Sequence, residues 1–131
     1  MNPLANMLVA VKNAGYAHKS EMILPYSLFK HAVARALHGS GYITSFEKKT
    51  REKGGDVLVV GIAFREDSRA PRITDIHLIS KPSRRVYKAA EKLRTVRQGF
   101  GHIFVTTPKG IMTSVEARKA NVGGEVLFEI W

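Results

Sequence analysis

The sequence predicts an α+β protein made of two small α+β lobes packed together. The first half alternates helical and strand-like segments, in the order helix, strand, helix, strand, strand. The second half is mainly strand-like with one short helix, and a charged, proline-terminated stretch separates the two halves. With 131 residues, the chain can bury roughly 65–70% of its unfolded surface without a metal or a disulfide. We place the N-terminal lobe at residues 1–66 and the C-terminal lobe at 67–131.

The first helix has a recognisable start and stop. Asn2 is a good N-cap residue, and Pro3 suits the first helical position. Apolar residues follow at helical spacing until Gly15, which we expect to end the helix. A short strand is expected at 22–24, ended by Pro25.

A second helix and a pair of strands complete the first lobe. Ser27 is expected to cap this helix and Gly39 to terminate it. The strands at 42–46 and 56–64 are expected to pair through the charged loop 48–55. The buried stripe of the helix is predicted to comprise Leu28, Phe29, Ala32, Val33, Ala36 and Leu37.

The second lobe follows a linker at 65–71. Thr113, with Glu116 three residues later, predicts a capping box for a helix at 114–120. Residues 88–96 could form a short basic helix or an irregular turn, and the pattern does not decide between them. The remaining extended segments are expected at 72–80, 85–87, 102–106 and 125–130.

The composition excludes several classes of site. Cysteine is absent, which excludes disulfides, thiolate zinc sites and cysteine catalysis. No run of 18 apolar residues occurs and no signal peptide is apparent, so we expect a cytoplasmic protein. His31 and His38 could share a helix face, but no third ligand stands at metal-binding spacing. No nucleophile elbow, P-loop or complete dinucleotide fingerprint occurs. We therefore expect no enzymatic activity, no cofactor and no metal.

Positive charge dominates and is clustered. The chain has 21 Lys and Arg against 11 Asp and Glu, a net charge of +10 that attracts polyanions. One alternative is a generic positive surface, since a charge run is usually a solvated face. No helix pattern suits an anionic membrane surface, so nucleic acid is the favoured partner. The two clusters are Lys48, Lys49, Arg51 and Lys53, and Lys81, Arg84, Arg85, Lys88, Lys92, Arg94 and Arg97.

Two turns favour RNA over DNA. The hydroxyls of Thr106 and Thr107, with the amides near Gly110, can hydrogen-bond to 2′-hydroxyls in a shallow groove. Glu125 could accept a proton from a base amino group or a sugar hydroxyl. The alternative is a plain hairpin turn, with residues 123–124 only a tight bend. Tyr87 could stack on a base or cover the core, and the core is the favoured reading.

Five motifs in order resemble the small-subunit ribosomal protein eight family, and they span essentially the whole chain. They are NPLANMLVAVKNA, PYSLFKHAVARALHGSGYI, LISKPSRRVY, GFGHIFVTTPKGIMTSVEAR and GGEVLFEIW. The chain departs from the family pattern at three places. Ser83 replaces a usual glycine, and Pro108 replaces a serine and so lacks both hydroxyl and amide proton. Phe128 stands where cysteine is frequent.

The resemblance implies a structural constituent of the small ribosomal subunit without a catalytic site. It implies binding to the central domain of small-subunit ribosomal RNA and a role in assembling the platform. The alternatives are a free-standing RNA-binding translational repressor and a small hydrolase with an undetected site. Implied partners are ribosomal proteins five and twelve and the protein's own messenger RNA. The RNA-binding residues so expected, mostly on loops of the second lobe, are Lys30, Lys81, Arg84, Arg85, Tyr87, Thr106, Thr107, Lys109, Gly110, Gly123, Gly124 and Glu125.

Overall fold

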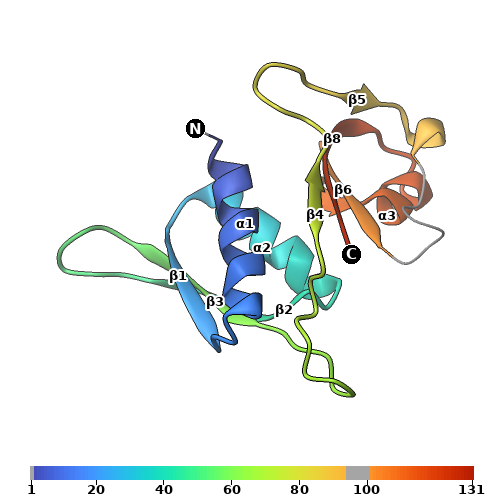
Figure 1. Cartoon of the computed structure of the whole chain (residues 1–131). Coiled ribbons are helices and arrows are strands. Elements are labelled where there is room, and N and C mark those ends of the chain that lie inside the picture. Colours follow the sequence, from blue (N-terminus) through green and yellow to red (C-terminus); the bar gives the residue numbers. More distant parts are fainter. Residues whose placement is uncertain (1, 94–100) are drawn as a thin grey trace. The chain divides into compact units, whose positions relative to one another are not determined.

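The chain folds into two compact units, each with helices and an antiparallel sheet (Figure 1). The structure is a computed structural model that describes residues 2–93 and 101–131. The units comprise Pro3–Thr74 and Asp75–Trp131, and the α+β class predicted from the sequence is confirmed. The division falls after residue 74 rather than after residue 66. The reason is a return of the chain onto the first unit, where the Arg72 amide donates to the Ala63 carbonyl at 3.1 Å.

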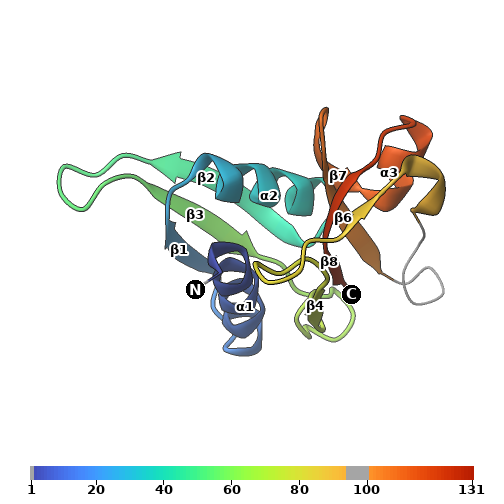
Figure 2. The ribbon, with the colours of Figure 1, turned by 90° about the horizontal axis from the view of Figure 1, so that it is seen from above.

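The N-terminal unit has the expected order of elements. These are α1 (Pro3–Tyr16), β1 (Glu21–Pro25), α2 (Leu28–Gly39), β2 (Ile43–Lys49) and β3 (Val57–Ile62). The three strands form an antiparallel sheet in the order β1-β3-β2. The β2–β3 hairpin is longer than expected, because β2 continues through Lys49, and its loop protrudes beyond the helices of this unit (Figure 2).

The helices cover the face of β3 that carries Val60 and Ile62. His31 and His38 of α2 each contact the ring of Phe46, the cross-strand partner of Val60. Gly15 of α1 lies so close to Pro71 that an added Cβ would be 3.1 Å from the Pro71 Cβ. Its small size therefore serves packing, and the prediction that it ends α1 is wrong. The helix continues to Tyr16, and His18 takes the left-handed conformation, with φ 54°.

The predicted buried stripe of α2 is wrong at its first two positions. Leu28 is 81% exposed and Phe29 is 41% exposed, whereas Val33, Ala34 and Leu37 are fully buried. At about 100° per residue, Leu28 points nearly opposite to Leu37, so both cannot face the sheet. As predicted, α2 ends at Gly39; Ser40 is its C-cap, and Gly41, with φ 81°, is the left-handed residue that follows.

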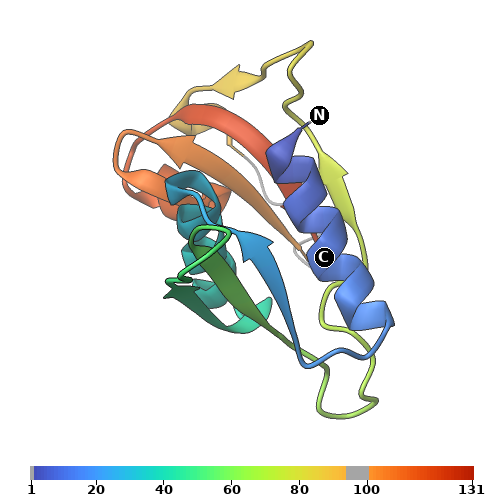
Figure 3. The ribbon, with the colours of Figure 1, turned by 90° about the vertical axis from the view of Figure 1, so that its left-hand side faces the viewer.

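The C-terminal unit is a five-stranded sheet with one short helix. In chain order it contains β4 (Ile76–Leu78), β5 (Tyr87–Lys88), a 3-10 helix η1 (Ala90–Lys92), β6 (His102–Thr107), β7 (Gly110–Thr113), α3 (Ser114–Lys119) and β8 (Gly124–Ile130). The strand order is β4-β8-β6-β7, and β5 also pairs with β8. Figure 3 shows β8, in red, beside β6, in orange. The core on the α3 side contains Leu93, Val105, Ala117 and Val126.

Several predicted segments of this unit need correction. The strand expected at 72–80 is reduced to β4, because residues 72–74 belong to the N-terminal unit. Part of 88–96 forms η1, and residues 94–96 lie outside the described part, as do Arg94 and Arg97 of the basic cluster. The turn at 106–113 contains an unpredicted strand, β7. The capping box is confirmed, since the Thr113 and Glu116 side chains accept each other's backbone amides at 3.2 and 3.1 Å.

Candidate nucleic-acid interface

The β6–β7 hairpin turns on Pro108 and Lys109. Proline fits the second position of a tight turn, and Gly110, with φ 116°, occupies the fourth position, where glycine is favoured. The Thr107 hydroxyl donates to the Gly110 carbonyl at 2.8 Å and accepts from the Lys109 amide at 3.1 Å. The Thr107 hydroxyl proton is therefore used inside the turn. Among the described residues, the Thr106 hydroxyl has no hydrogen-bond partner and can serve a ligand.

Gly123 and Gly124 let three segments of backbone come close together. A Cβ on Gly124 would overlap the Thr106 carbonyl oxygen of β6, and a Cβ on Gly123 would overlap the Lys88 carbonyl oxygen of β5. Neither glycine has a positive φ, so these positions need the missing side chain and not the glycine conformation. The two predicted turns are adjacent as a result, because the 123–125 segment at the start of β8 packs directly against Thr106 of β6.

Four side chains share one face of the sheet around this point. Glu125 of β8 lies opposite Thr106 of β6 and opposite Tyr87 of β5, and cross-strand partners project to the same face. Arg85 stands two residues before Tyr87, and its Nη1 lies 3.1 Å from Glu125 Oε2. We call Arg85, Tyr87, Thr106 and Glu125 the Glu125 patch. The neighbouring β8 residue Val126 faces the α3 side, so the patch occupies the sheet face away from the helix.

The Glu125 patch contains an ion pair and is not purely positive. The Glu125 side chain is only 13% exposed, while that of Arg85 is 56% exposed. Glu125 therefore lies beneath a cation that water reaches, and it remains an acceptor for a ligand proton. Tyr87 is 68% exposed, so the prediction that it covers the core is wrong. Its ring is available to stack.

The other predicted residues do not belong to the patch. Lys81 and Arg84 are exposed on the loop between β4 and β5. Lys30 belongs to α2 in the N-terminal unit, where its Nζ donates to the Pro25 carbonyl at 3.2 Å. Ser80, which the sequence patterns did not indicate, is buried, and its hydroxyl accepts from the Val86 amide at 2.9 Å and so fixes the base of that loop. The position of Ser80 directly before Lys81-Pro82, at the start of a turn, is the sequence feature that could have indicated this role.

The second basic cluster is partly neutralised. Lys48 Nζ lies 3.5 Å from Asp56 Oδ2 and 4.6 Å from the centre of the Tyr26 ring. Arg51 and Lys53 are exposed on the hairpin loop, and Lys49 is exposed at the end of β2. This hairpin therefore offers long cationic side chains, which can attract a polyanion but are not part of a polar surface such as the Glu125 patch.

Residues 2–93 and 101–131 contain no group of three His, Cys, Asp or Glu side chains placed to hold a metal ion. No helix in this part of the chain has the length and apolar character needed to cross a membrane. The fold and the Glu125 patch define a class: small basic α+β proteins that present cations, hydroxyls and a carboxylate on paired turns.

Comparison with known proteins gives the family. The model of the family described as Ribosomal protein S8 matches residues 2–131. The chain is 39% identical to small ribosomal subunit protein uS8 of Syntrophus aciditrophicus over 99% of this chain and 97% of the relative. The corresponding uS8 proteins of Cereibacter sphaeroides strain KD131 and Mycoplasmopsis agalactiae are each 41% identical, with 98% and 97% of the relative covered. The chain belongs to the ribosomal protein S8 family.

Proposed function

We propose that the chain is a structural constituent of the small ribosomal subunit and acts there by binding ribosomal RNA. The observation that carries this proposal is the family match over residues 2–131, together with relatives named as small-subunit proteins that the chain matches over 97% and 98% of their length. The family is not enzymatic, and the chain works in the cytoplasm as part of the subunit. A free-standing repressor finds no support in these observations.

We further propose that the Glu125 patch and the β6–β7 turn read the RNA. The register of Thr106 and Tyr87 against Glu125 supports this, because it gathers a free hydroxyl, an exposed ring and an acceptor on one face. The Thr106 hydroxyl can pair with a 2′-hydroxyl, and Tyr87 can stack on a base unpaired at an irregularity. Lys109, at the tip of the turn, can neutralise a phosphate.

The finer assignments follow from the resemblance. The RNA is the central domain of small-subunit ribosomal RNA, where the protein helps to assemble the platform. Lys30 of the N-terminal unit would contact neighbouring RNA. Ribosomal proteins five and twelve are the proposed neighbours, and the protein's own messenger would be a second RNA with the same kind of site.

Co-sedimentation with the small subunit, and footprinting on a central-domain RNA fragment, test the proposal directly. We expect the purified protein to bind the fragment and to protect an irregular helix in it. A protein that binds the fragment no better than an unrelated duplex RNA would overturn the proposed function.

Glu125→Ala tests whether the patch reads the RNA. We expect it to weaken binding to the cognate fragment by about 1–3 kcal/mol, the cost of leaving polar partners unpaired. Binding to an unrelated RNA should not weaken, because the change releases Arg85 for phosphate contact. Glu91→Ala, which removes an exposed carboxylate of η1 in the same unit, is the matched control. Equal losses on both RNAs would show that the patch does not read the site.

A further inference from the structure

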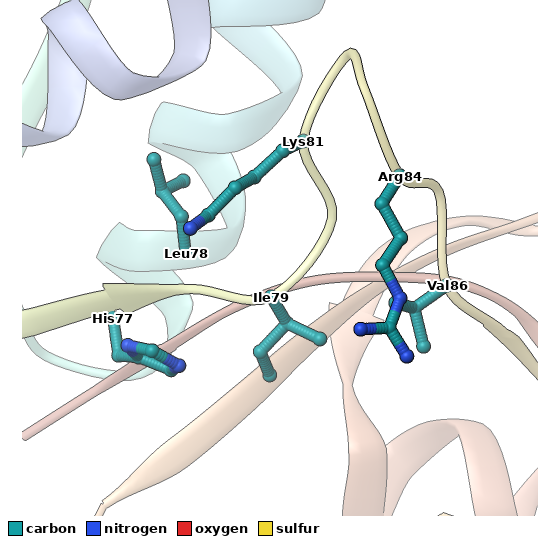
Figure 4. A pocket seen from close by; sticks show the side chains of 6 residues that line it. All are labelled: His77, Leu78, Ile79, Lys81, Arg84 and Val86. Carbon is teal, nitrogen blue, oxygen red and sulfur yellow. The ribbon is translucent and has the colours of Figure 1, made fainter.

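A hollow of about 350 Å³ in the N-terminal unit is lined by His18, Phe64 and Arg69, and we call it the Arg69 hollow. Its volume lies within the range for small-ligand sites, about 300–1,000 Å³. A hollow of about 300 Å³ in the C-terminal unit is less suited to one ligand. There the side chains of Lys81 and Arg84 lie on opposite sides of β4 and the chain that follows it (Figure 4).

An aromatic pair forms part of the wall of the Arg69 hollow. The rings of His18 and Phe64 are stacked, with centroids 5.7 Å apart and planes inclined by 10°. His18 follows the end of α1 and Phe64 follows the end of β3, so the pair joins segments far apart in the sequence. His18 is exposed and Phe64 is partly buried. An apolar group that covers the pair would therefore be removed from water on an aromatic surface.

Backbone hydrogen bonds fix the segments around the hollow. The Arg65 amide donates to the Ala70 carbonyl at 2.8 Å and the Arg69 amide to the Arg65 carbonyl at 2.9 Å, which closes the loop that carries Arg69. The His18 amide donates to the Gly15 carbonyl at 3.0 Å. His18 and Arg69 both have left-handed backbone, with φ 54° and 59°, which glycine adopts with less strain. Such strained positions cluster at ligand sites, and here both carry side chains that line the hollow.

The Arg69 guanidinium is available to a ligand. Arg69 is exposed, and within residues 2–93 and 101–131 its guanidinium forms no ion pair and no hydrogen bond. Glu66 and Asp67 belong to the same loop and are exposed, but neither forms an ion pair with Arg69. The cation beside the aromatic pair is therefore not neutralised by its own loop.

The charges around the hollow are balanced, which distinguishes it from the basic clusters. The loop 65–70 contains two cations, Arg65 and Arg69, and two carboxylates, Glu66 and Asp67. The segment 81–88, for comparison, contains four cations and no carboxylate. A polyanion gains affinity from an excess of positive charge, whereas one carboxylate needs one matched cation. The Arg69 hollow therefore suits a single carboxylate beside an apolar group better than an RNA strand.

We propose that the Arg69 hollow binds an acidic side chain of a neighbouring protein, together with an apolar side chain next to it. This inference rests on the proposed function, because a constituent of the small subunit has protein neighbours. The Arg69 guanidinium holds the carboxylate through two parallel N–H donors, and an imidazole N–H of His18 supplies a further donor. The apolar side chain covers Phe64. Arginine and aromatic side chains of this kind are enriched at protein interfaces.

Titration of the full chain by NMR tests the hollow, with 3-phenylpropionate as the probe. This probe joins a carboxylate to an apolar ring, while 3-phenylpropanamide lacks the charge and acetate lacks the ring. We expect 3-phenylpropionate to shift the ring signals of His18 and Phe64, and to bind about tenfold more tightly than either control. Equal affinity for the amide or for acetate would overturn the proposal. Shifts confined to other His and Phe rings would overturn it as well.

Charge-matched variants give the second test. Arg69→Gln should weaken binding of 3-phenylpropionate about tenfold, through loss of the charged donors. Arg51→Gln, which removes an exposed cation of the β2–β3 loop in the same unit, should leave it unchanged. Both side chains are exposed, so both variants should fold, and their melting temperatures check this. Equal losses in the two variants would mean that net charge, and not the hollow, binds the probe.

Cross-linking in assembled small subunits identifies the occupant. A photoreactive amino acid in place of Lys19, which is exposed next to His18, should cross-link to a protein segment that contains Asp or Glu. A cross-link to ribosomal RNA or to a segment without a carboxylate would overturn the proposal, as would the absence of any cross-link. A chain that does not enter the subunit would instead overturn the proposed function, and the 3-phenylpropionate titration reports on the hollow independently of it.

Discussion

Thr106 and Thr107 are neighbours with different roles. The Thr107 hydroxyl makes two hydrogen bonds within its own turn, whereas the Thr106 hydroxyl has no partner among the described residues. Side-chain bonds of this kind stabilise a turn in place of contacting a ligand. In the sequence the two hydroxyls look equivalent, and only the geometry of the turn shows that they have different roles.

Alanine substitutions at the two threonines should therefore give different results. Thr107→Ala should lower the free energy of unfolding by about 0.5–1.5 kcal/mol, and it should weaken cognate RNA binding only indirectly, through the altered turn. Thr106→Ala should weaken cognate binding by about 1–3 kcal/mol but change stability by less than about 0.5 kcal/mol. Neither variant should weaken binding to unrelated RNA. Chemical denaturation and RNA titration measure the two quantities, and a Thr107→Ala variant of unchanged stability would contradict the role in the turn.

At the scale of the element, the start of β8 leaves no space for side chains at two consecutive positions. It passes between β5 and β6 at Gly123 and Gly124, where any side chain would overlap a backbone carbonyl. Backbone cannot move aside as a flexible side chain can, so β8 would have to separate from its neighbours. Such a separation would also take Glu125 away from Thr106.

A pair of glycine substitutions tests this constraint. Gly124→Ala should destabilise the protein by about 1–3 kcal/mol, as overpacking does, and should weaken cognate RNA binding with it. Gly39→Ala in α2 meets no atom within 4 Å and should be neutral or stabilise by up to about 1 kcal/mol. Thermal unfolding of both variants measures this. Equal melting temperatures would show that β8 tolerates a side chain where we infer none fits.

The helices show where patterns succeed and fail at this scale. The capping box of α3 was predictable because its bonds join residues three apart. The face of α2 was misassigned because Leu28 and Phe29 are apolar, while the sheet covers only the side that carries Val33 and Leu37. Periodicity locates a helix, but packing partners decide which apolar side chains it buries.

At the scale of the whole molecule, the net charge of +10 sets affinity for any polyanion. Affinity gained by neutralising phosphates depends on salt and carries no sequence information. The cations that remain unpaired should therefore act on all RNAs alike. Arg84 is one of them, whereas Arg85 is engaged with Glu125.

Salt dependence should distinguish these two arginines. Arg84→Ala should weaken cognate and unrelated RNA alike, and lower the slope of log affinity against log salt by about 0.7–0.9 for one lost phosphate contact. Arg85→Ala should change the slope little, because Arg85 is engaged with Glu125, but it should weaken cognate RNA, because it leaves the Glu125 carboxylate uncompensated next to the RNA. Affinities measured across a range of salt concentrations test this. An unchanged slope for Arg84→Ala would contradict phosphate contact there, and an equal fall in slope for both variants would contradict the engagement of Arg85 with Glu125.

The sequence by itself determined the α+β class, the order of helices and strands, the cationic character and the family, because these depend on local periodicity, composition and ordered motifs. Only the tertiary structure decided that Thr106, Tyr87 and Glu125 meet on one face and that Tyr87 is exposed. It also decided that Arg85 is paired with Glu125, whereas Arg84 has no ion-pair partner within residues 2–93 and 101–131. These facts depend on strand register and on backbone approach between residues far apart in the chain, which no local pattern encodes.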